Sequence, residues 1–189
     1  MALDINKMYE RAQAAFKEIE YWPQDKVDEM VNAAGWAWSK EENAMAMARL
    51  AVDESSIGVY EDKVAKIQSK TRGSLWQMRD VKTCGLVEED KEKGLKKYAK
   101  PIGVIANIVP CTNPESTVTA LGVNILKTRN AMIVSPHPRT KGSTNLAVKI
   151  GRDALKKIGA PPDLLQCLAE PSHESTVELM ELCDFSVAT

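Results

Sequence analysis

The sequence predicts an α/β protein in which a helical N-terminal segment precedes a parallel sheet with alternating helices. Apolar residues recur at three- and four-residue spacing through about the first 80 residues, a period typical of amphipathic helices. After Pro101, short β-branched runs alternate with helical stretches, which is the pattern of strands joined by helical crossovers. The chain has 189 residues, enough to bury a sizeable core in one domain or in one and a half.

Charge and composition narrow the class of protein. Lys and Arg total 25 against 26 Asp and Glu, so the formal charge of −1 lacks the basic surplus of a nucleic-acid-binding protein. No apolar run approaches the roughly 20 residues that a membrane-spanning helix needs. Met1–Asp4 leads into an amphipathic pattern without a secretory leader. We therefore expect a cytoplasmic protein that binds neither nucleic acid nor membrane.

The four cysteines, Cys84, Cys111, Cys167 and Cys183, are widely spaced along the chain. They form no C-x-x-C motif and have no nearby pair of histidines, so the sequence predicts no metal site. Without a secretory leader they are expected to be reduced thiols. Cys167 and Cys183 are interpreted as small buried apolar residues.

Residues 1–80 are expected to form a helical N-terminal segment, starting at Leu3. The first helix carries an apolar stripe within Ile5–Ile19, and Pro23 is placed at the first position of the second helix. Ser39–Glu42 has the pattern of a capping box that opens a third helix, which breaks at 53–56. A fourth helical stretch runs from about Val59 to about residue 77. The Met and Trp residues at these spacings are interpreted as core filling.

Residues 81–100 are expected to connect the two halves by a strand and a turn. Gly85 and Gly94 flank the charged run 88–93, a composition typical of an exposed turn between short strands.

Residues 101–189 are expected to form the sheet and its crossover helices. Strands are predicted at 102–109, 131–135, 164–168 and 184–188 from their short apolar runs. Asn113 and Pro114 suit the N-cap and first position of a helix that ends near Asn130. Ser143 or Thr144 is expected to open the next helix, which ends at 159, and 172–182 forms the last helix. This alternation makes the second half a candidate nucleotide-binding region.

Ligands of open parallel sheets bind beyond the carboxyl ends of the strands. The loops there are 110–113, 136–139 and 169–171, with Thr189 at the start of a fourth. No G-x-G-x-x-G motif follows any strand, so the usual dinucleotide fingerprint is absent. Composition and periodicity alone do not name a reaction.

Three segments extend the interpretation because they resemble a known family. Pro101–Pro114 (PIGVIANIVPCTNP) resembles the strand and oxyanion-hole loop of the aldehyde dehydrogenase superfamily. Lys127–Arg139 (KTRNAMIVSPHPR) resembles its CoA-acylating branch, which includes the aldehyde half of bifunctional aldehyde-alcohol dehydrogenases. Lys82–Asp90 (KTCGLVEED) is similar to a segment typical of that branch. The resemblance is strong over about 81–189 and loose over the first 80 residues.

The resemblance implies a Rossmann-like region, 101–189, that is the incomplete NAD-binding domain of an aldehyde dehydrogenase. Members oxidise an aldehyde with NAD and transfer the acyl group from a cysteine thioester to coenzyme A. The aldehydes of acylating relatives include acetaldehyde, propionaldehyde, a semialdehyde and sulfoacetaldehyde. NAD is expected over NADP, with CoA as the co-substrate.

The resemblance also assigns site residues. The side-chain amide of Asn113 is implied to donate to the oxyanion, the alternative being that it only caps the next helix. Arg139 is implied to meet a cofactor phosphate, or else is a surface arginine. His137 lines the adenosine site, which NAD and CoA share in turn, or else is an exposed loop residue without a ligand. The remaining cofactor-binding residues that the resemblance implies are Val109, Pro110, Cys111, Thr112, Ser135, Pro136, Pro138, Pro171 and Thr189.

Cys111 lies close to Asn113, where a thiol at a helix N-terminus can have a lowered pKa. The family places its nucleophilic cysteine well downstream, so Cys111 is interpreted as a lining residue and no catalytic cysteine is expected in this chain. We therefore expect the N-terminal part of an acylating aldehyde dehydrogenase, inactive alone and homo-oligomeric in its full-length form.

Two alternatives stay open. The chain is a non-catalytic nucleotide-binding or subunit-interaction protein derived from that fold, or an unrelated helical interaction module, which leaves the loop motifs unexplained. The resemblance also allows a second location, the interior of a bacterial microcompartment, in which the protein would be cargo.

Overall fold

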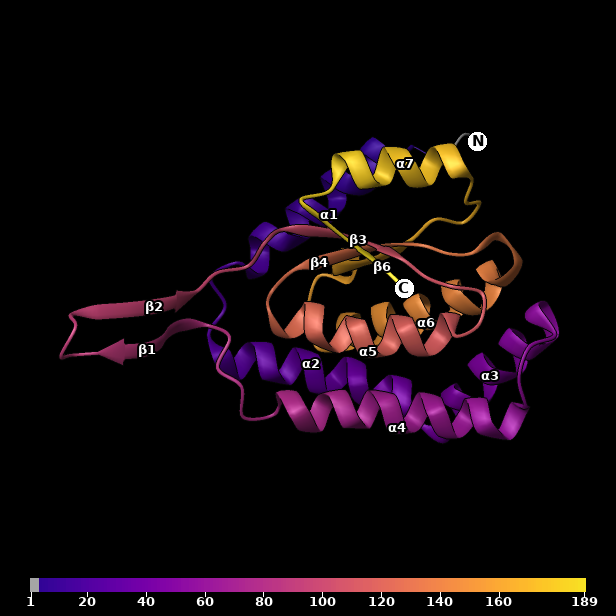
Figure 1. The fold of residues 1–189 in the computed structure, drawn as a ribbon, viewed down its shortest axis with the longest axis horizontal. Helices are drawn as coiled ribbons and strands as arrows, with labels where there is room; N and C mark the ends of the chain where they lie inside the picture. The colour runs from indigo at the N-terminus through magenta and orange to yellow at the C-terminus, as the bar shows by residue number, and fades with distance from the viewer. Residues whose placement is uncertain (1–3) are drawn as a thin grey trace.

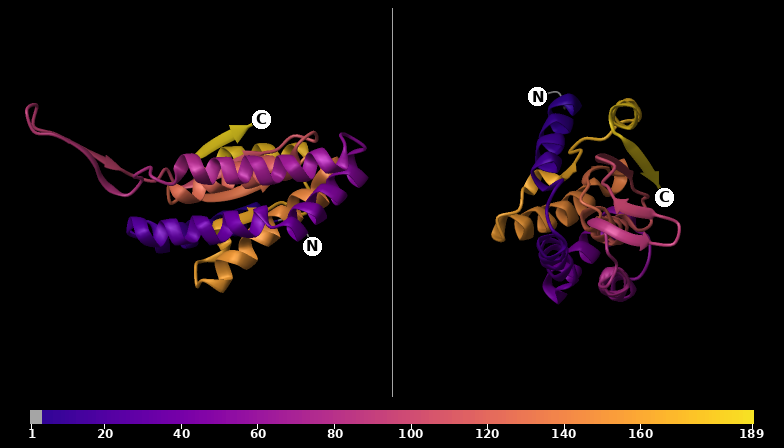
Figure 2. Two further views of the ribbon diagram at one scale, coloured as in Figure 1. Left: turned by 90° about the horizontal axis from the view of Figure 1, so that it is seen from below. Right: turned by 90° about the vertical axis from the view of Figure 1, so that its left-hand side faces the viewer.

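The structure is a computed structural model that describes residues 4–189, so Leu3 lies outside the described range. Its layers are visible in Figures 1 and 2: a four-stranded parallel sheet has α1 (Ile5–Ile19) and α7 (His173–Leu182) on one face. On the other face, α5 (Pro114–Lys127) and α6 (Lys141–Lys157) cover the sheet. Three further helices form an outer layer against α5 and α6. The predicted α/β class is confirmed.

The outer layer consists of α2 (Gln24–Ser39), α3 (Glu41–Ser55) and α4 (Tyr60–Met78). Together with α1 they confirm the four predicted helices of the N-terminal segment. Two details of their ends differ from the prediction. Pro23 precedes α2 in an extended conformation instead of occupying its first position. The predicted capping box is wrong, because Ser39 is the last residue of α2 and its hydroxyl donates to the Trp36 carbonyl 3.3 Å away.

The sheet has the order β5-β4-β3-β6 and all three pairings are parallel. Its strands are β3 (Val104–Ile108), β4 (Ala131–Ser135), β5 (Leu165–Cys167) and β6 (Phe185–Ala188), which confirms the four predicted strands. The two central strands, β3 and β4, consist of residues that are nearly all buried and that are apolar except for Asn107 and Ser135, because each strand is covered on both faces.

The start of α6 differs from the prediction. The helix begins at Lys141, after a short 3-10 turn at Pro138–Thr140, and Ser143 lies buried in its first turn. The carboxylate of Glu54, at the end of α3, accepts from the backbone N–H groups of Gly142 and Ser143, both at 2.8 Å. A side chain from a distant helix therefore satisfies donors that the sequence assigns to a local cap.

Trp38 of α2 ties the outer layer to the sheet layer. Its ring is fully buried, and its Nε1 donates to the carbonyl of Ala147 on α6 at 2.8 Å. Gly122 and Gly151 face this ring, where an added Cβ would lie 2.6 Å and 2.5 Å from its nearest atoms. The absence of a side chain at these two positions lets α5 and α6 close around the indole. Residues of the helical segment and of the sheet thus share one hydrophobic core.

The segment 81–100 forms an antiparallel hairpin, β1 (Gly85–Asp90) and β2 (Leu95–Ala99), that projects from the body of the molecule (Figures 1 and 2). Its acidic first strand faces its basic second strand, with Lys97–Glu88 at 2.7 Å and Lys96–Glu89 at 3.3 Å. The predicted exposed turn between short strands is confirmed at residues 91–94, whereas the first half of the charged run, 88–90, belongs to β1.

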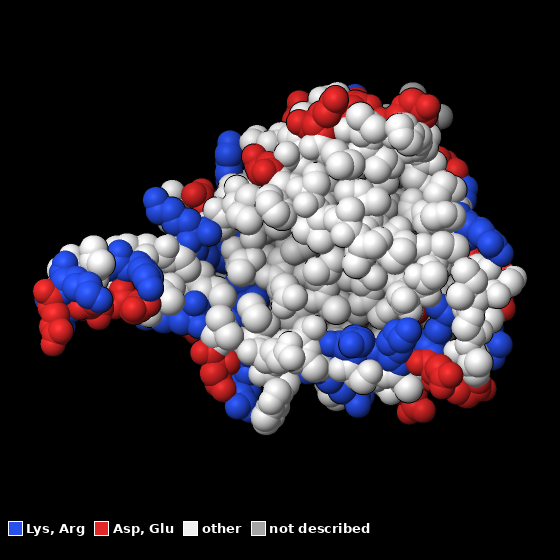
Figure 3. Space-filling model, viewed as in Figure 1, with Lys and Arg blue, Asp and Glu red and all other residues white. Residues whose placement is uncertain are grey.

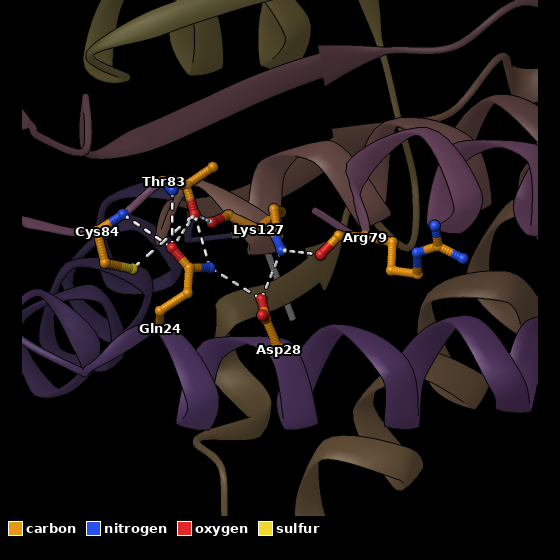
Figure 4. A network of polar contacts seen from close by, with 6 residues as sticks. All are labelled: Gln24, Asp28, Arg79, Thr83, Cys84 and Lys127. Carbon is orange, nitrogen blue, oxygen red and sulfur yellow. Dashed lines mark hydrogen bonds and ion pairs between the residues drawn. The ribbon is translucent and has the colours of Figure 1, made fainter. Parts of the chain in front are cut away.

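A polar network holds the segment that leads into the hairpin (Figure 4). The Gln24 Oε1 atom of α2 accepts from the backbone N–H groups of Thr83 and Cys84, at 2.7 and 3.1 Å. The Thr83 hydroxyl donates to the Lys127 carbonyl at 2.6 Å, and the buried ammonium of Lys127 lies 2.6 Å from the Asp28 carboxylate. The Lys82–Asp90 motif thus begins with an anchored stretch, locked between α2 and the end of α5.

Within residues 4–189, no helix is long and apolar enough to cross a membrane. The same residues hold no group of three or more His, Cys, Asp or Glu side chains arranged for a metal ion.

Candidate functional site

The candidate site lies at the carboxyl edge of the sheet, where the loops after β3 and β4 and the residue after β6 meet. Neighbouring backbones connect these segments: Val109 N–H donates to the Ser135 carbonyl at 3.1 Å, and Thr189 N–H to the Ile108 carbonyl at 3.4 Å. The structure thus brings together Val109, Ser135 and Thr189, three of the residues proposed from the sequence. Parallel pairing of β3 with both β4 and β6 is the cause.

Asn113 stands at the N-cap position of α5, but its side chain does not cap the helix. The backbone carbonyl of Asn113 accepts from Thr117 N–H at 3.1 Å, whereas its Oδ1 accepts from the Lys66 ammonium at 2.8 Å. Its Nδ2 lies 3.5 Å from the Thr112 hydroxyl, at the limit of a hydrogen bond. A lysine ammonium can only donate, so Lys66 must face the oxygen of the Asn113 amide and not its nitrogen. The Nδ2 hydrogens are therefore left for another acceptor.

A buried pair of opposite charges, Lys63 and Glu115, packs against the loop that holds Asn113. This pair was not predicted from the sequence. The Lys63 ammonium donates to the Thr112 carbonyl at 2.8 Å and lies 3.7 Å from the carboxylate of Glu115. Glu115 is fully buried, and burial raises the pKa of its carboxyl while Lys63 opposes the rise. A signal was present: Lys63 precedes the buried Ile67 by four residues, which places this cation on the apolar face of α4.

A groove of about 350 Å³ opens beside Asn113, between α4, α5 and the end of β6. Its polar lining includes Lys66, Lys70 and Asn113, and its apolar wall includes Leu121 and Val187. Figure 3 shows a broad face without charged side chains over α5 and β6, with Lys and Arg side chains along its α4 border. The groove thus joins an amide donor, two cations and an apolar wall.

The loop after β4 presents the other set of proposed residues. Ser135 and Pro136 are buried, and the Ser135 hydroxyl lies 2.7 Å from that of Thr176 on α7. His137, Pro138 and Arg139 are exposed. The Arg139 guanidinium donates to the Ser55 carbonyl at 2.6 Å, so the end of α3 holds part of this side chain.

The other predicted lining residues flank these loops. Pro110, Cys111 and Pro171 are half-buried, and Thr112 is exposed. Their role toward a cofactor stays a prediction.

Two cysteines are less buried than predicted. Cys167 and Cys183 are half-buried, because each lies at the border of the core instead of inside it. Burial of its sulfur raises the pKa of Cys167 far above its ordinary value, and burial together with Asp184 raises that of Cys183 to about 12. Neither thiol is prepared to ionise as a nucleophile.

Comparisons with known proteins place these features in context. The model of the aldehyde dehydrogenase family matches residues 1–188. The sulfoacetaldehyde dehydrogenase of Acholeplasma sp. is 44% identical over 179 residues, which cover 95% of this chain and 37% of that protein. The acetylating succinate-semialdehyde dehydrogenase of Clostridium kluyveri is 40% identical over 188 residues, 99% of this chain and 41% of that protein.

A solved structure agrees with these matches. The acetylating aldehyde dehydrogenase of Geobacillus thermoglucosidasius superposes with a TM-score of 0.92 at 34% identity, covering 97% of this chain and 40% of that one. The chain therefore spans about two fifths of the length of the relatives that it matches.

Proposed function

This chain belongs to the aldehyde dehydrogenase family, in its CoA-acylating branch, and on that premise we propose that it is the N-terminal part of an enzyme that oxidises an aldehyde with NAD and passes the acyl group to coenzyme A. Two solved relatives, each 26% identical to this chain, contain such ligands. An engineered glycolyl-CoA reductase has bound NADP+, and a propionaldehyde dehydrogenase of Rhodopseudomonas palustris has bound CoA.

The orientation of the Asn113 amide is the observation that supports the proposal most. When a thiolate adds to an aldehyde carbon, the carbonyl oxygen gains negative charge and needs a fixed donor. Lys66 holds Oδ1 at 2.8 Å, so the Nδ2 hydrogens are left for that oxygen beside the groove. Removing one such donor typically costs about 2.7–4 kcal/mol of transition-state stabilisation.

The loop after β4 fits a nucleotide. No acidic residue interrupts the stretch from Ser135 to Thr140, and His137 and Arg139 are exposed there. One bond to Ser55 leaves further N–H donors on the Arg139 guanidinium for a phosphate. When bound, NAD supplies the hydride acceptor and CoA the thiol that takes the acyl group. In this proposal His137, Pro138 and Arg139 hold the adenosine end of NAD or CoA.

We propose that the nucleophilic cysteine comes from outside residues 1–189. Cys84 is buried, and burial raises the pKa of both Cys167 and Cys183. Cys111 is in the Asn113 loop, where its half-buried side chain serves as lining. In this scheme the chain provides the oxyanion donor and the nucleotide loop, and does not turn over an aldehyde alone.

We further propose a homo-oligomer in the cytoplasm for the full-length enzyme. The four cysteines are free thiols, which suits a reducing compartment. A microcompartment is the alternative location, since a solved relative is a propionaldehyde dehydrogenase from the fucose-utilisation microcompartment of Clostridium phytofermentans.

Titrating the purified chain with NAD and with CoA in a calorimeter tests whether it binds a nucleotide. We expect NAD or CoA to bind, and Arg139→Ala to weaken binding. Lys149→Ala, which removes an exposed lysine paired with Asp153 within α6, should leave binding unchanged. A folded chain that binds neither nucleotide would contradict it.

Reading the gene beyond the codon for Thr189 tests the catalytic part. We expect the frame to continue and to encode a cysteine, and Asn113→Ala in that longer protein to lower kcat about 10²–10³-fold. An immediate stop codon would favour the alternative, a non-catalytic nucleotide-binding or subunit-interaction protein.

A further inference from the structure

We propose that Lys63 is a positioning residue for the oxyanion donor: it fixes the backbone beside Asn113, and the buried carboxylate of Glu115 keeps its ammonium in place. This inference rests on the proposed function, because it takes the Asn113 amide as the donor to the aldehyde oxygen. It adds to that reaction two buried groups that act through the loop and not by touching the substrate.

Two lysines of α4 bind two consecutive residues of the loop after β3. Lys63 donates to the backbone carbonyl of Thr112 at 2.8 Å. Lys66 donates to the Oδ1 atom of Asn113, the next residue, also at 2.8 Å. The lysines are three residues apart, so they are neighbours on one face of the helix. One bond thus fixes the backbone immediately before Asn113, and the other fixes which way its side-chain amide points.

The two bonds differ in their exposure to water. Only 5% of the Lys63 side chain is exposed, whereas Lys66 is an exposed residue. Water competes for an exposed ammonium, and holding a long exposed side chain costs rotamer freedom, so such a bond contributes little. The buried Lys63 therefore sets the position of the loop, and Lys66 orients the amide on a backbone that is already fixed.

The surroundings of Lys63 restrict where its ammonium can lie. Gly58, in the loop before α4, packs against its aliphatic stem, since a Cβ added there would lie 3.3 Å from Lys63 Cε. At the tip of the side chain, the ammonium faces the Thr112 carbonyl and, 3.7 Å away, the Glu115 carboxylate. Among residues 4–189, these two groups are its only side-chain polar contacts.

Glu115 supplies the negative charge that this arrangement needs. A buried ammonium without a counter-charge is costly and tends to lose its proton. Glu115 is fully buried at the start of α5, and neither of its carboxylate oxygens makes a hydrogen bond within residues 4–189. Burying such a pair gives little net stability, because desolvation of both ions offsets their attraction. The main consequence of the pair is a fixed place for the ammonium, and through it for the Thr112 carbonyl.

A double variant separates positioning from stability. Lys63→Met alone leaves the Glu115 carboxylate buried without its cation, so this variant should unfold at a lower urea concentration than the wild type. Lys63→Met/Glu115→Met removes both charges, so its urea midpoint should recover toward the wild type. The Thr112 carbonyl has still lost its donor. The backbone order parameters of Thr112 and Asn113, measured by ¹⁵N relaxation of the 189-residue chain, should therefore fall from about 0.85 to about 0.6 or lower.

The other buried lysine pair of α5 provides a matched control. Lys127 lies 2.6 Å from Asp28 and is the last residue of α5, roughly 20 Å along the helix from Asn113. Lys127→Met/Asp28→Asn therefore removes a buried charge pair at the far end of the same helix. This variant should leave the order parameters of Thr112 and Asn113 unchanged.

Order parameters at both loop residues that stay unchanged in the Lys63→Met/Glu115→Met variant would overturn the inference. In the longer enzyme of the proposed function, the same variant should lower kcat about 100-fold with little change in KM, because a misplacement of about 1 Å can cost that much in rate. Full kcat in Asn113→Ala would refute the function proposed for the amide. A lowered kcat in Asn113→Ala together with full kcat in the double variant would refute the positioning role alone.

Discussion

The contact between Gly151 and the Trp38 ring allows a quantitative test of how the helical segment joins the sheet. In Gly151→Ala, the new Cβ would lie 2.5 Å from Trp38 Cζ2 and 2.7 Å from Leu165 Cδ1. These separations are roughly 1 Å shorter than a favourable carbon–carbon contact. The indole has little room to move, because it is fully buried and its Nε1 is bonded to the Ala147 carbonyl at 2.8 Å.

Overpacking of this kind costs about 1–3 kcal/mol. The alanine also favours the helix, by about 0.5–1 kcal/mol. Gly73→Ala is the matched control, since Gly73 lies inside α4 and an added Cβ there meets nothing within 4 Å. The helix preference therefore cancels between the variants, and Gly151→Ala should be less stable than Gly73→Ala by about 1–3 kcal/mol.

Urea unfolding followed by circular dichroism measures this difference, and thermal unfolding checks it at about 2–4 °C per kcal/mol for a chain of this length. Equal stability of the two variants would refute the reasoning, because it would mean that α2 does not hold Trp38 rigidly between α5 and α6.

Three further predictions concern polar groups. Burial raises the pKa of Glu115 above its ordinary 4.5, so the folded state holds this proton more tightly, and stability falls as the pH rises through the raised pKa. The free energy of unfolding of the wild type relative to Glu115→Gln should thus decrease from about pH 4.5 upward in urea titrations; a difference independent of pH would contradict this. Gln24→Ala should cost about 1–3 kcal/mol and speed amide exchange at Thr83 and Cys84, which lose their acceptor; unchanged exchange at both amides argues against the anchoring role. Glu54→Ala should destabilise by about 0.5–2 kcal/mol in thermal unfolding, because it exposes the first N–H groups of α6; the exposed Glu42→Ala serves as control, and equal effects would count against the cap.

Elements governed by local pattern could be predicted from the sequence. The strands at Val104–Ile108 and Ala131–Ser135 are apolar except for Asn107 and Ser135, because helices cover the sheet on both faces. The helix predicted at 172–182 also starts by a local device, because the structure shows Ser172 in a capping box with Ser175, three residues further on. The loop motifs around Asn113 and His137 pointed to the family for the same reason: they are contiguous residues that keep their chemistry in any context.

Contacts between distant residues decided the rest. Glu54 replaces the local cap that the sequence indicated at Ser143, because folding brings the end of α3 to the start of α6. The sequence likewise placed α1 with the other N-terminal helices, whereas its apolar stripe packs on the opposite face of the sheet beside α7.

The sequence by itself determined the α/β class, the succession of helices and strands along the chain, and the family that its loops resemble. Periodicity and short motifs are local properties, and they are enough for these three conclusions. Only the tertiary structure decided what surrounds Asn113: the Lys66 bond to its amide, the buried Lys63–Glu115 pair beneath its loop, and the groove with Lys70. The physical reason is that α4 and α5 are distant in sequence and meet only when both bury their apolar faces in one core.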